Sequence, residues 1–512
     1  MESEVQTLVI VLYLLTLSVL ALYGLHRSAL LLAYLRRRSA LARPSAHFTE
    51  AELPLVTIQL PMFNEMFVAE RVIEAAARID YPRDRIEIQV LDDSTDSTSA
   101  IARVKCAELR ARGIDAKYVH RKDRRGFKAG ALEAGTKSAR GEFLLIFDAD
   151  FTPGPEVLRE LVDFFTDPRV AMVQARWSHV NRGASLLTRC QALLLDGHFI
   201  IEHGARSRSG RFFNFNGTAG IWRKEAIADA GGWQHDTITE DMDLSYRAQL
   251  AGWKFIYAPG TSAPAELPDE MNGFKGQQYR WAKGSVQTAR KLLGTIFEAQ
   301  VSWEVKAEAF FHLSNNFAYV FLLLLATLQL PNMLIRRQLE RPELLMLDVP
   351  LFLATCGSIA AFYVVAHRDL YGRRWEAIRL LPAMMALGIG LSINNGRAAL
   401  EGLFGHDVEF VRTPKLGDAL SKGPRYRSKW TWHNMLELVF ALYCTTSLLV
   451  AIVTRSWASV PFLLLFCVGF SWVAVASLRE ALGTRLVAQG DPGLAAQAPS
   501  THSSPSPQSM LS

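Results

Sequence analysis

Residues 143–150 read Phe-Leu-Leu-Ile-Phe-Asp-Ala-Asp, an apolar run that ends in two carboxylates. Three similar short apolar runs are typical of strands buried on both faces: residues 55–60, 86–91 and 170–174. The segments between them, such as residues 65–79, have helical spacing. Strands that alternate with helices predict an α/β domain with a mostly parallel sheet.

Acidic side chains follow two of the predicted strands. Asp92 and Asp93 close one strand, and Asp148 and Asp150 close another. Ligands of parallel sheets bind beyond the carboxyl ends of the strands, so we expect these carboxylates at one edge. Asp148 and Asp150 can share Mg²⁺ or Mn²⁺ with diphosphate oxygens, although a solvated turn would have the same pattern. Asp92 or Asp93 would reach a nucleotide or the metal, or the segment only caps the next helix.

Two turns offer further groups for a nucleotide. Phe63 and Glu65 lie in a turn expected beside Asp93, where the Phe63 ring gives a flat surface for a base or packs in the core. Lys128 lies in a glycine-flanked turn before a helix, where its ammonium can meet a phosphate or remain in solvent. The chain has no G-x-x-x-x-G-K-[ST] loop, which disfavours an ATP-driven transporter.

Two later motifs suit sugar chemistry. Glu240 and Asp241 open a predicted helix, where an acid could also serve only the helix dipole. Gln277 can bond sugar hydroxyls, Arg280 can neutralise diphosphate and Trp281 can stack on a pyranose, although an amphipathic helix at a membrane would also carry them. One carboxylate pair for a cation and a separate carboxylate for the attacking hydroxyl predict a metal-dependent sugar transferase.

Composition indicates a membrane protein with a large water-exposed part. The 512 residues are 50% hydrophobic and the formal net charge is +6. Basic residues fall beside apolar runs, which favours contact with anionic lipid and no binding of nucleic acid. Five scattered cysteines without paired spacing indicate neither a zinc site nor a disulfide framework.

The first apolar run, residues 5–24, is long enough to span a bilayer as a helix. Two acids precede it and three arginines, at 36–38, follow it. The positive-inside rule then places the N-terminus outside and the next domain in the cytoplasm, and this order of charges disfavours a cleaved signal peptide.

The expected domain order has six parts. They are an N-terminal transmembrane helix at 1–35, the cytoplasmic α/β domain at 36–300, two transmembrane helices at 301–370, an interfacial helix with a loop at 371–433, two transmembrane helices at 434–480 and a disordered tail at 481–512. The run at 380–393 is short and contains Pro382, so we expect it to lie in the membrane interface. This assignment returns the loop at 410–415 to the cytoplasm.

Several motifs in order carry a family likeness. The chain resembles the family 2 glycosyltransferases, and most closely the cellulose-synthase-like group that includes plant glucomannan 4-beta-mannosyltransferase. The motifs that carry it are residues 61–65, 91–96, 148–150, 173–177, 215–220, 240–244 and 277–281, and Phe410 to Lys415, which looks like a gating loop.

The resemblance implies a GT-A domain, an inverting transfer and a channel for the growing polymer. It implies that Asp241 is the general base, that Asp148 and Asp150 hold the metal, and that Asp93 binds the nucleotide. Gln277, Arg280 and Trp281, with Glu240 beside the base, would hold the acceptor end and the donor diphosphate. Phe410, Thr413 and Lys415 belong to the loop that would close over the nucleotide, in which Arg412 departs from the family's valine.

The sequence thus predicts a processive synthase of a β-linked, preferably β-1,4, mannan, glucomannan or glucan. Its expected partners are GDP-mannose or UDP-glucose, the growing polysaccharide and membrane lipid. An enzyme that adds one sugar to a membrane lipid is the alternative, and a receptor without catalysis is disfavoured because idle buried acids destabilise a fold. Richness in alanine, leucine and arginine favours a bacterial inner membrane, with the Golgi membrane as the location in a eukaryote.

Overall fold

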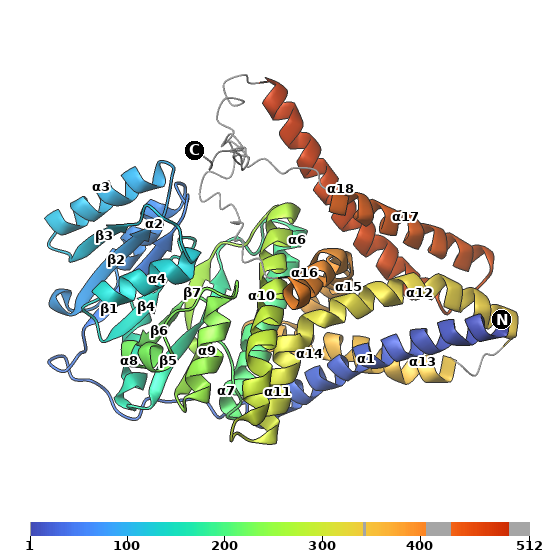
Figure 1. Cartoon of the computed structure of the whole chain (residues 1–512), viewed down its shortest axis with the longest axis horizontal. Coiled ribbons are helices and arrows are strands. Elements are labelled where there is room, and N and C mark those ends of the chain that lie inside the picture. Colours follow the sequence, from blue (N-terminus) through green and yellow to red (C-terminus); the bar gives the residue numbers. More distant parts are fainter. Residues whose placement is uncertain (1, 341–344, 406–431, 491–512) are drawn as a thin grey trace, which may run out of the picture.

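The computed structural model describes residues 2–340, 345–405 and 432–490. The predicted gating-loop residues Phe410, Thr413 and Lys415 lie outside these ranges, as does most of the predicted tail. The chain forms a sheet domain at one end and a group of long helices at the other, with the N-terminus at the far end of the helices (Figure 1).

Seven strands form one mixed, mostly parallel sheet in the order β3-β2-β1-β4-β6-β5-β7. Only β6 runs antiparallel, between β4 and β5. The strands are β1 Val56–Met62, β2 Ile86–Asp92, β3 Ala116–His120, β4 Phe143–Ile146, β5 Val170–His179, β6 Gly220–Arg223 and β7 Lys254–Ala265. The side chains of β4 are at most 1% exposed, as expected for a strand covered on both faces. The sheet confirms the predicted α/β class.

Helices cover both faces of the sheet and build the second half of the chain. In the sheet domain they are α2 Ala69–Ala77, α3 Thr98–Ala111, α4 Phe127–Ser138, α5 Val157–Val162, α6 Leu186–Gly197, α7 Gly204–Arg208, α8 Lys224–Asp229 and α9 Glu240–Leu250. Around and after it are α1 Glu2–Arg36, α10 Met271–Glu298, α11 Trp303–Ser314, α12 Ala318–Leu339, α13 Leu345–Phe352, α14 Ser358–Tyr371, α15 Arg374–Gly390, α16 Ser392–Phe404, α17 Trp432–Val453 and α18 Val460–Gly490. Short 3-10 and π segments are η1 Arg83–Arg85, η2 Asp163–Thr166, η3 His198–His203, η4 Asn315–Phe317 and η6 Leu353–Gly357.

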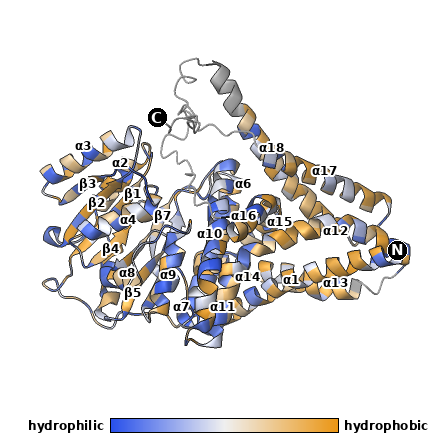
Figure 2. Cartoon of the chain, in the orientation of Figure 1, coloured by the Kyte–Doolittle hydropathy of each residue, from blue (hydrophilic) through white to orange (hydrophobic). Residues whose placement is uncertain are grey.

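Five helical segments in the described ranges are long and apolar enough to cross a membrane. They are Ser3–Arg36, Trp303–Leu339, Met346–Tyr371, Trp432–Val453 and Val460–Leu482. Figure 2 shows these helices as mainly hydrophobic, in contrast to the mixed colouring of the sheet domain. The helices α15 and α16 form a pair bent by 47°, which could together be a sixth span. This pair contains the run that the sequence assigns to the membrane interface.

Helix ends differ from the expected boundaries in two places. α1 continues to Arg36, so the first of the three arginines at 36–38 is its last residue. α18 continues to Gly490, ten residues past the expected end of the last transmembrane part at 480. Residues 479–482 read Arg-Glu-Ala-Leu, which are all strong helix formers, so the helix continues past the apolar run.

Candidate active site

The carboxyl end of β4 places Asp148 and Asp150 at the edge of the sheet. The backbone N–H of Asp148 donates to Thr218 Oγ1 at 2.9 Å, which ties the turn to the segment that enters β6. Ala149 between the two acids is buried, whereas both aspartates are partly exposed. Both carboxylates therefore lie at the edge of the sheet with part of their surface exposed.

Lys128 is placed against this turn. Its Nζ forms an ion pair with Asp148 and donates to the Gly217 carbonyl at 2.9 Å. The preceding Gly126 has φ of +71°, the left-handed conformation that glycine adopts easily, and it brings Lys128 into the first turn of α4. The sequence predicted this lysine as a phosphate-binding group, and the structure gives it a carboxylate partner on the predicted cation site.

Asp241, the second residue of α9, lies beside Gly217 and close to Lys128. A Cβ on Gly217 would lie 3.0 Å from Asp241 Oδ2 and 3.4 Å from Lys128 Nζ. Gly217 also has φ of +80°, so both backbone conformation and space favour glycine here. The chain thus brings Asp148, Lys128, Gly217 and Asp241 together from four separate segments.

Lys128, Glu240, Asp241 and Asp148 are close enough to change one another's pKa. Burial raises the pKa of Asp241 and of its neighbour Glu240 above the ordinary carboxyl range. Burial alone would lower the pKa of Lys128, but Asp148, Glu240 and Asp241 outweigh it and raise that pKa. A carboxylate with a raised pKa binds protons more readily, as a general base must.

The helix α10 carries the three residues predicted to hold the acceptor end and the donor diphosphate. Gln277, Arg280 and Trp281 are partly buried and lie within one turn, on adjacent positions of one face. Burial lowers the pKa of Arg280 to about 10, and the charge of Asp148 opposes that shift. The ring of Trp281 lies 6.5 Å from the ring of Trp177 at the end of β5. The motif therefore borders the Asp148 turn.

Asp92 and Asp93 are held by the protein rather than directed at an open site. Asp92 is fully buried and accepts hydrogen bonds from Ser99 Oγ at 2.6 Å and Tyr118 Oη at 2.7 Å. Asp93 forms a two-pronged ion pair with Arg121. A nucleotide contact by Asp93 would have to compete with this arginine, which the sequence did not reveal.

The turn before α2 also differs in detail from expectation. The Phe63 ring is partly buried, and the Arg124 guanidinium carbon lies 3.3 Å from its centroid. One face of the ring is therefore covered by a cation and would have to be uncovered for a base to stack on it. The Glu65 carbonyl accepts the N–H groups of Val68 and Ala69, which starts the helical turn.

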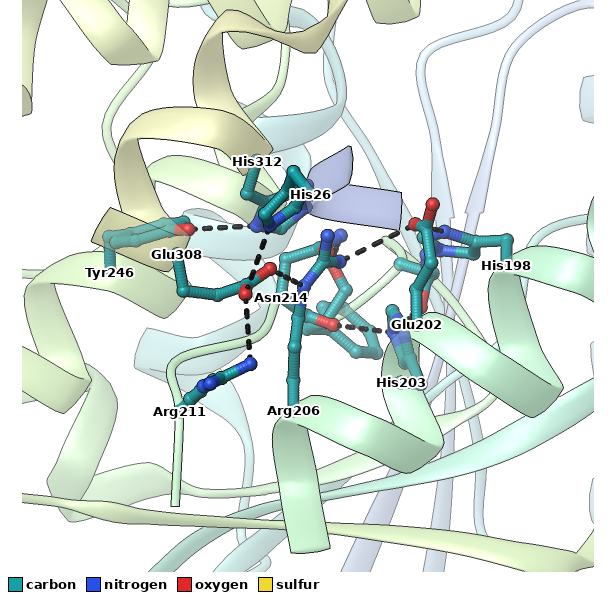
Figure 3. A network of polar contacts seen from close by, with 12 residues as sticks. His26, His198, Glu202, His203, Arg206, Arg211, Asn214, Tyr246, Glu308 and His312 are labelled. Atoms are coloured by element: carbon teal, nitrogen blue, oxygen red, sulfur yellow. Dashed lines mark hydrogen bonds and ion pairs between the residues drawn. The ribbon is translucent and has the colours of Figure 1, made fainter. Parts of the chain in front are cut away.

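A network of polar side chains includes Asn216, the residue before Gly217, and Figure 3 shows the histidines, acids and arginines of this network. Asn216 Nδ2 lies 2.9 Å from His198 Nε2, and Asn216 Oδ1 lies 2.7 Å from His203 Nε2. His203 Nε2 also lies 3.1 Å from the Asn214 carbonyl, which can only accept. His203 Nε2 must therefore carry a proton, which it donates to Asn216 Oδ1. The Asn216 NH₂ group then donates to His198 Nε2. His198 accordingly carries its proton on Nδ1 and donates it to Glu202 at 2.9 Å.

The network continues toward the first long helix. Arg206 bridges Glu202 and Glu308, and His26 of α1 contacts Glu308 at 3.2 Å. Figure 3 shows these side chains as one connected group. Tyr246, on the same helix as Asp241, bonds His312 at 2.8 Å. Sequence reasoning missed this network because its members are single histidines and acids without a motif spacing.

We expect Asn216→Ala to lower kcat about 100-fold, because it removes the side-chain hydrogen bonds that hold the loop next to Asp241 and Lys128. A shift of about 1 Å in a catalytic group is enough to lower a rate by about that factor. The KM for the sugar donor should change less. His198→Gln should retain activity, since its amide oxygen can still accept from Asn216, whereas His198→Ala should not. Steady-state kinetics on all three variants checks this, and equal activity of the Gln and Ala variants would contradict it.

A divalent cation fits this donor set. Among the residues that the structure describes, no three His, Cys, Asp or Glu side chains are grouped to hold a metal. Mg²⁺ at sites for phosphate compounds is typically bound by one or two carboxylates, with phosphate oxygens and water supplying the rest. Asp148 and Asp150 supply such a pair, and the Lys128 ammonium beside Asp148 shows that a positive charge is accommodated there.

Comparison with known proteins places this geometry in a family. Residues 143–365 match the family model described as Glycosyl transferase family group 2. Glucomannan 4-beta-mannosyltransferase 7 of Arabidopsis thaliana is 35% identical over 409 residues, which cover 77% of this chain and 71% of that protein. Probable glucomannan 4-beta-mannosyltransferase 7 of Oryza sativa subsp. japonica is 45% identical over 254 residues, or 49% of this chain and 43% of that protein.

A solved mannosyltransferase from Pyrobaculum calidifontis, in complex with GDP-Man and Mn²⁺, has 22% identity and a TM-score of 0.49, covering 69% of this chain and 99% of that one. The family assignment rests on the sequence relatives and the family model and does not use this structural similarity. With the sheet order and the ordered motifs, they show that this chain is a family 2 glycosyltransferase of the cellulose-synthase-like group.

Proposed function

We propose that this chain polymerises a β-1,4-linked mannan or glucomannan from GDP-mannose, with UDP-glucose as the second candidate donor. The observation that carries the proposal is the convergence of Asp148, Lys128 and Asp241 around Gly217. The names of the relatives, which are glucomannan 4-beta-mannosyltransferases, support mannose as the sugar and β-1,4 as the linkage. The sugar would be transferred by a single inverting displacement.

In this reaction Asp241 accepts the proton of the acceptor's terminal hydroxyl, and that oxygen bonds to the anomeric carbon. The bond from that carbon to the diphosphate breaks on the opposite side, and the leaving group takes the electron pair. Lys128 and Arg280, whose charges both interact with Asp148, would neutralise the charge of the leaving diphosphate. Mg²⁺ or Mn²⁺, held by Asp148 and Asp150, would neutralise further diphosphate oxygens when bound.

The proposed arrangement puts the sheet domain in the cytoplasm and the product's path among the helices that follow it. The apolar segments and the arginines that end α1 support this orientation. A long polymer needs both a site for its growing end and a way out, and α10, which carries Gln277 and Trp281, packs against α16 and α18. Repeated transfer without release then extends the chain.

Incubation of purified membranes with radiolabelled GDP-mannose or UDP-glucose tests the proposal. We expect a high-molecular-weight product from GDP-mannose that a β-1,4-mannanase digests. A product that extracts into organic solvent and carries one sugar would overturn polymerisation and identify transfer to a lipid. A polymer made only from UDP-glucose would overturn the donor.

Trp281→Ala is expected to weaken binding of a short mannan acceptor about 3- to 10-fold and to shorten the products, because a stacking contact is worth about 0.5–1.5 kcal/mol. Donor hydrolysis in the absence of acceptor should change less. Trp303→Ala, which removes a side chain 70% exposed at the start of α11, is the matched control. Product-size analysis by gel filtration gives the readout, and unchanged product lengths would remove Trp281 from the acceptor site.

A further inference from the structure

A cavity lies away from the Asp148 turn, where α6, α14 and α15 meet. Its volume is about 750 Å³. Five arginines and one tryptophan line it, namely Arg189, Arg368, Arg373, Arg374, Arg379 and Trp375. We call it the arginine cavity. A volume of this size is typical of small-molecule sites, and a wall of arginines selects an anion.

The positive charge of the cavity is only partly neutralised. Glu376, the acid in its wall, pairs with Arg182 at 3.3 Å, with His367 at 3.4 Å and with Arg189 of the wall itself at 4.0 Å. Asp369 pairs with Arg368 and with Arg38. In the part of the chain that the structure describes, no carboxylate forms an ion pair with Arg373, Arg374 or Arg379. These three arginines are exposed and line the cavity, and the Arg374 guanidinium carbon also lies 5.3 Å from the centroid of the Trp375 ring.

The chemistry of the wall favours a phosphate group. Guanidinium groups bind phosphate oxygens in pairs, which a single ammonium cannot do. The helix α15 begins at Arg374 without a side-chain cap from Arg373, so its first N–H groups remain for an acceptor. The arginines and the start of α15 thus line one cavity, which is built from the consecutive helices α14 and α15 and from α6 of the sheet domain.

The surroundings favour a lipid over a soluble anion. Trp375 is 63% exposed and Ile378 is 38% exposed, and they lie three residues apart on one face of α15 beside the arginines. Tyr371, the last residue of the candidate span Met346–Tyr371, comes just before the cavity. An apolar face with a tryptophan, next to arginines at the end of a span, is the pattern of a helix at a membrane surface.

We infer that the arginine cavity binds the phosphate of an anionic phospholipid headgroup, with Trp375 against the lipid. The bound lipid joins Arg189 of the sheet domain to the end of α14 and the start of α15. It therefore fixes the sheet domain on the membrane face. This inference does not depend on which sugar the enzyme transfers.

Quenching by brominated lipids tests the inference on the full-length chain in detergent. Brominated phosphatidylglycerol should quench the part of the tryptophan fluorescence that Trp375→Phe removes, and it should do so saturably. Brominated phosphatidylcholine should quench it only at much higher mole fraction. Arg373→Gln with Arg374→Gln should weaken the phosphatidylglycerol effect about 30-fold, since each arginine contributes roughly a factor of five near an anionic lipid.

A matched control removes two exposed arginines at the far end of the sheet domain. Arg83→Gln with Arg110→Gln takes away the same charge and should leave the quenching curve unchanged. Equal loss in both double variants would mean a general charge effect and overturn the site. Inorganic phosphate and pyrophosphate form the third arm: if either abolishes the quenching at micromolar concentration, the cavity is a site for a soluble anion and the lipid assignment is wrong. Gel filtration and thermal unfolding of each variant exclude misfolding as the cause.

Discussion

Asp241→Asn is expected to abolish sugar transfer while the enzyme still binds its nucleotide sugar. The amide has the shape of the carboxylate but cannot accept the proton of the attacking hydroxyl, and loss of a general base lowers rates about 100- to 10,000-fold. Binding should persist because Asp148, Lys128 and Arg280, which surround the diphosphate in our proposal, are untouched. Transfer from radiolabelled GDP-mannose and calorimetric binding of the same donor measure the two properties separately.

The control for this variant is Asp229→Asn, which neutralises an exposed acid at the end of α8. It should retain full activity. An Asp241→Asn enzyme with more than about a tenth of the wild-type rate would show that another group accepts the proton. Loss of donor binding in the variant would instead assign Asp241 to the binding of substrate.

The pH profile of the wild-type enzyme follows from the same carboxylate. Burial raises the pKa of Asp241, so more of it is protonated at a given acidic pH than in an ordinary aspartate. A protonated base cannot take the hydroxyl's proton, so kcat/KM should fall as the pH is lowered through this pKa and level off above it. A midpoint at or below the usual aspartate range would contradict the buried environment.

Removal of the divalent cation should have the second large effect. Chelation is expected to lower transfer about 1,000-fold or more, because a metal at a diphosphate supplies several kcal/mol of charge stabilisation. Added Mg²⁺ or Mn²⁺ should restore the wild-type rate. Asp148→Asn with Asp150→Asn should lose activity that neither metal restores, since the amides have lost the charge that holds the ion.

Thermal unfolding of the double variant separates metal loss from misfolding. Both side chains are partly exposed, so we expect a melting temperature close to that of the wild type. Donor titration in the presence of Mn²⁺ gives a second readout, in which the variant should bind more weakly. Full activity of the wild-type enzyme after exhaustive chelation would make the Lys128 ammonium, and not a metal, the main counter-charge of the diphosphate.

Much of the sheet was predictable because burial on both faces leaves a clear mark. The strands β1, β2, β4 and β5 each overlap one of the apolar runs that the sequence singled out. β6 is only four residues long, and β7 contains Pro259, Gly260 and Pro264, which argue against a strand when read locally. A register shift in its pairing with β5, between Ala175 and Arg176, lets the sheet tolerate these residues.

The sequence by itself determined the class of fold, the apolar helices and the order of the acidic motifs, because these depend on the type and spacing of neighbouring residues. Tertiary structure alone decided that Arg121 and Tyr118 engage Asp93 and Asp92, and that Gly217 brings Asp241 to Lys128. These contacts join residues far apart in the chain. Such pairings are set by how the packed elements meet, and local periodicity carries no information about them.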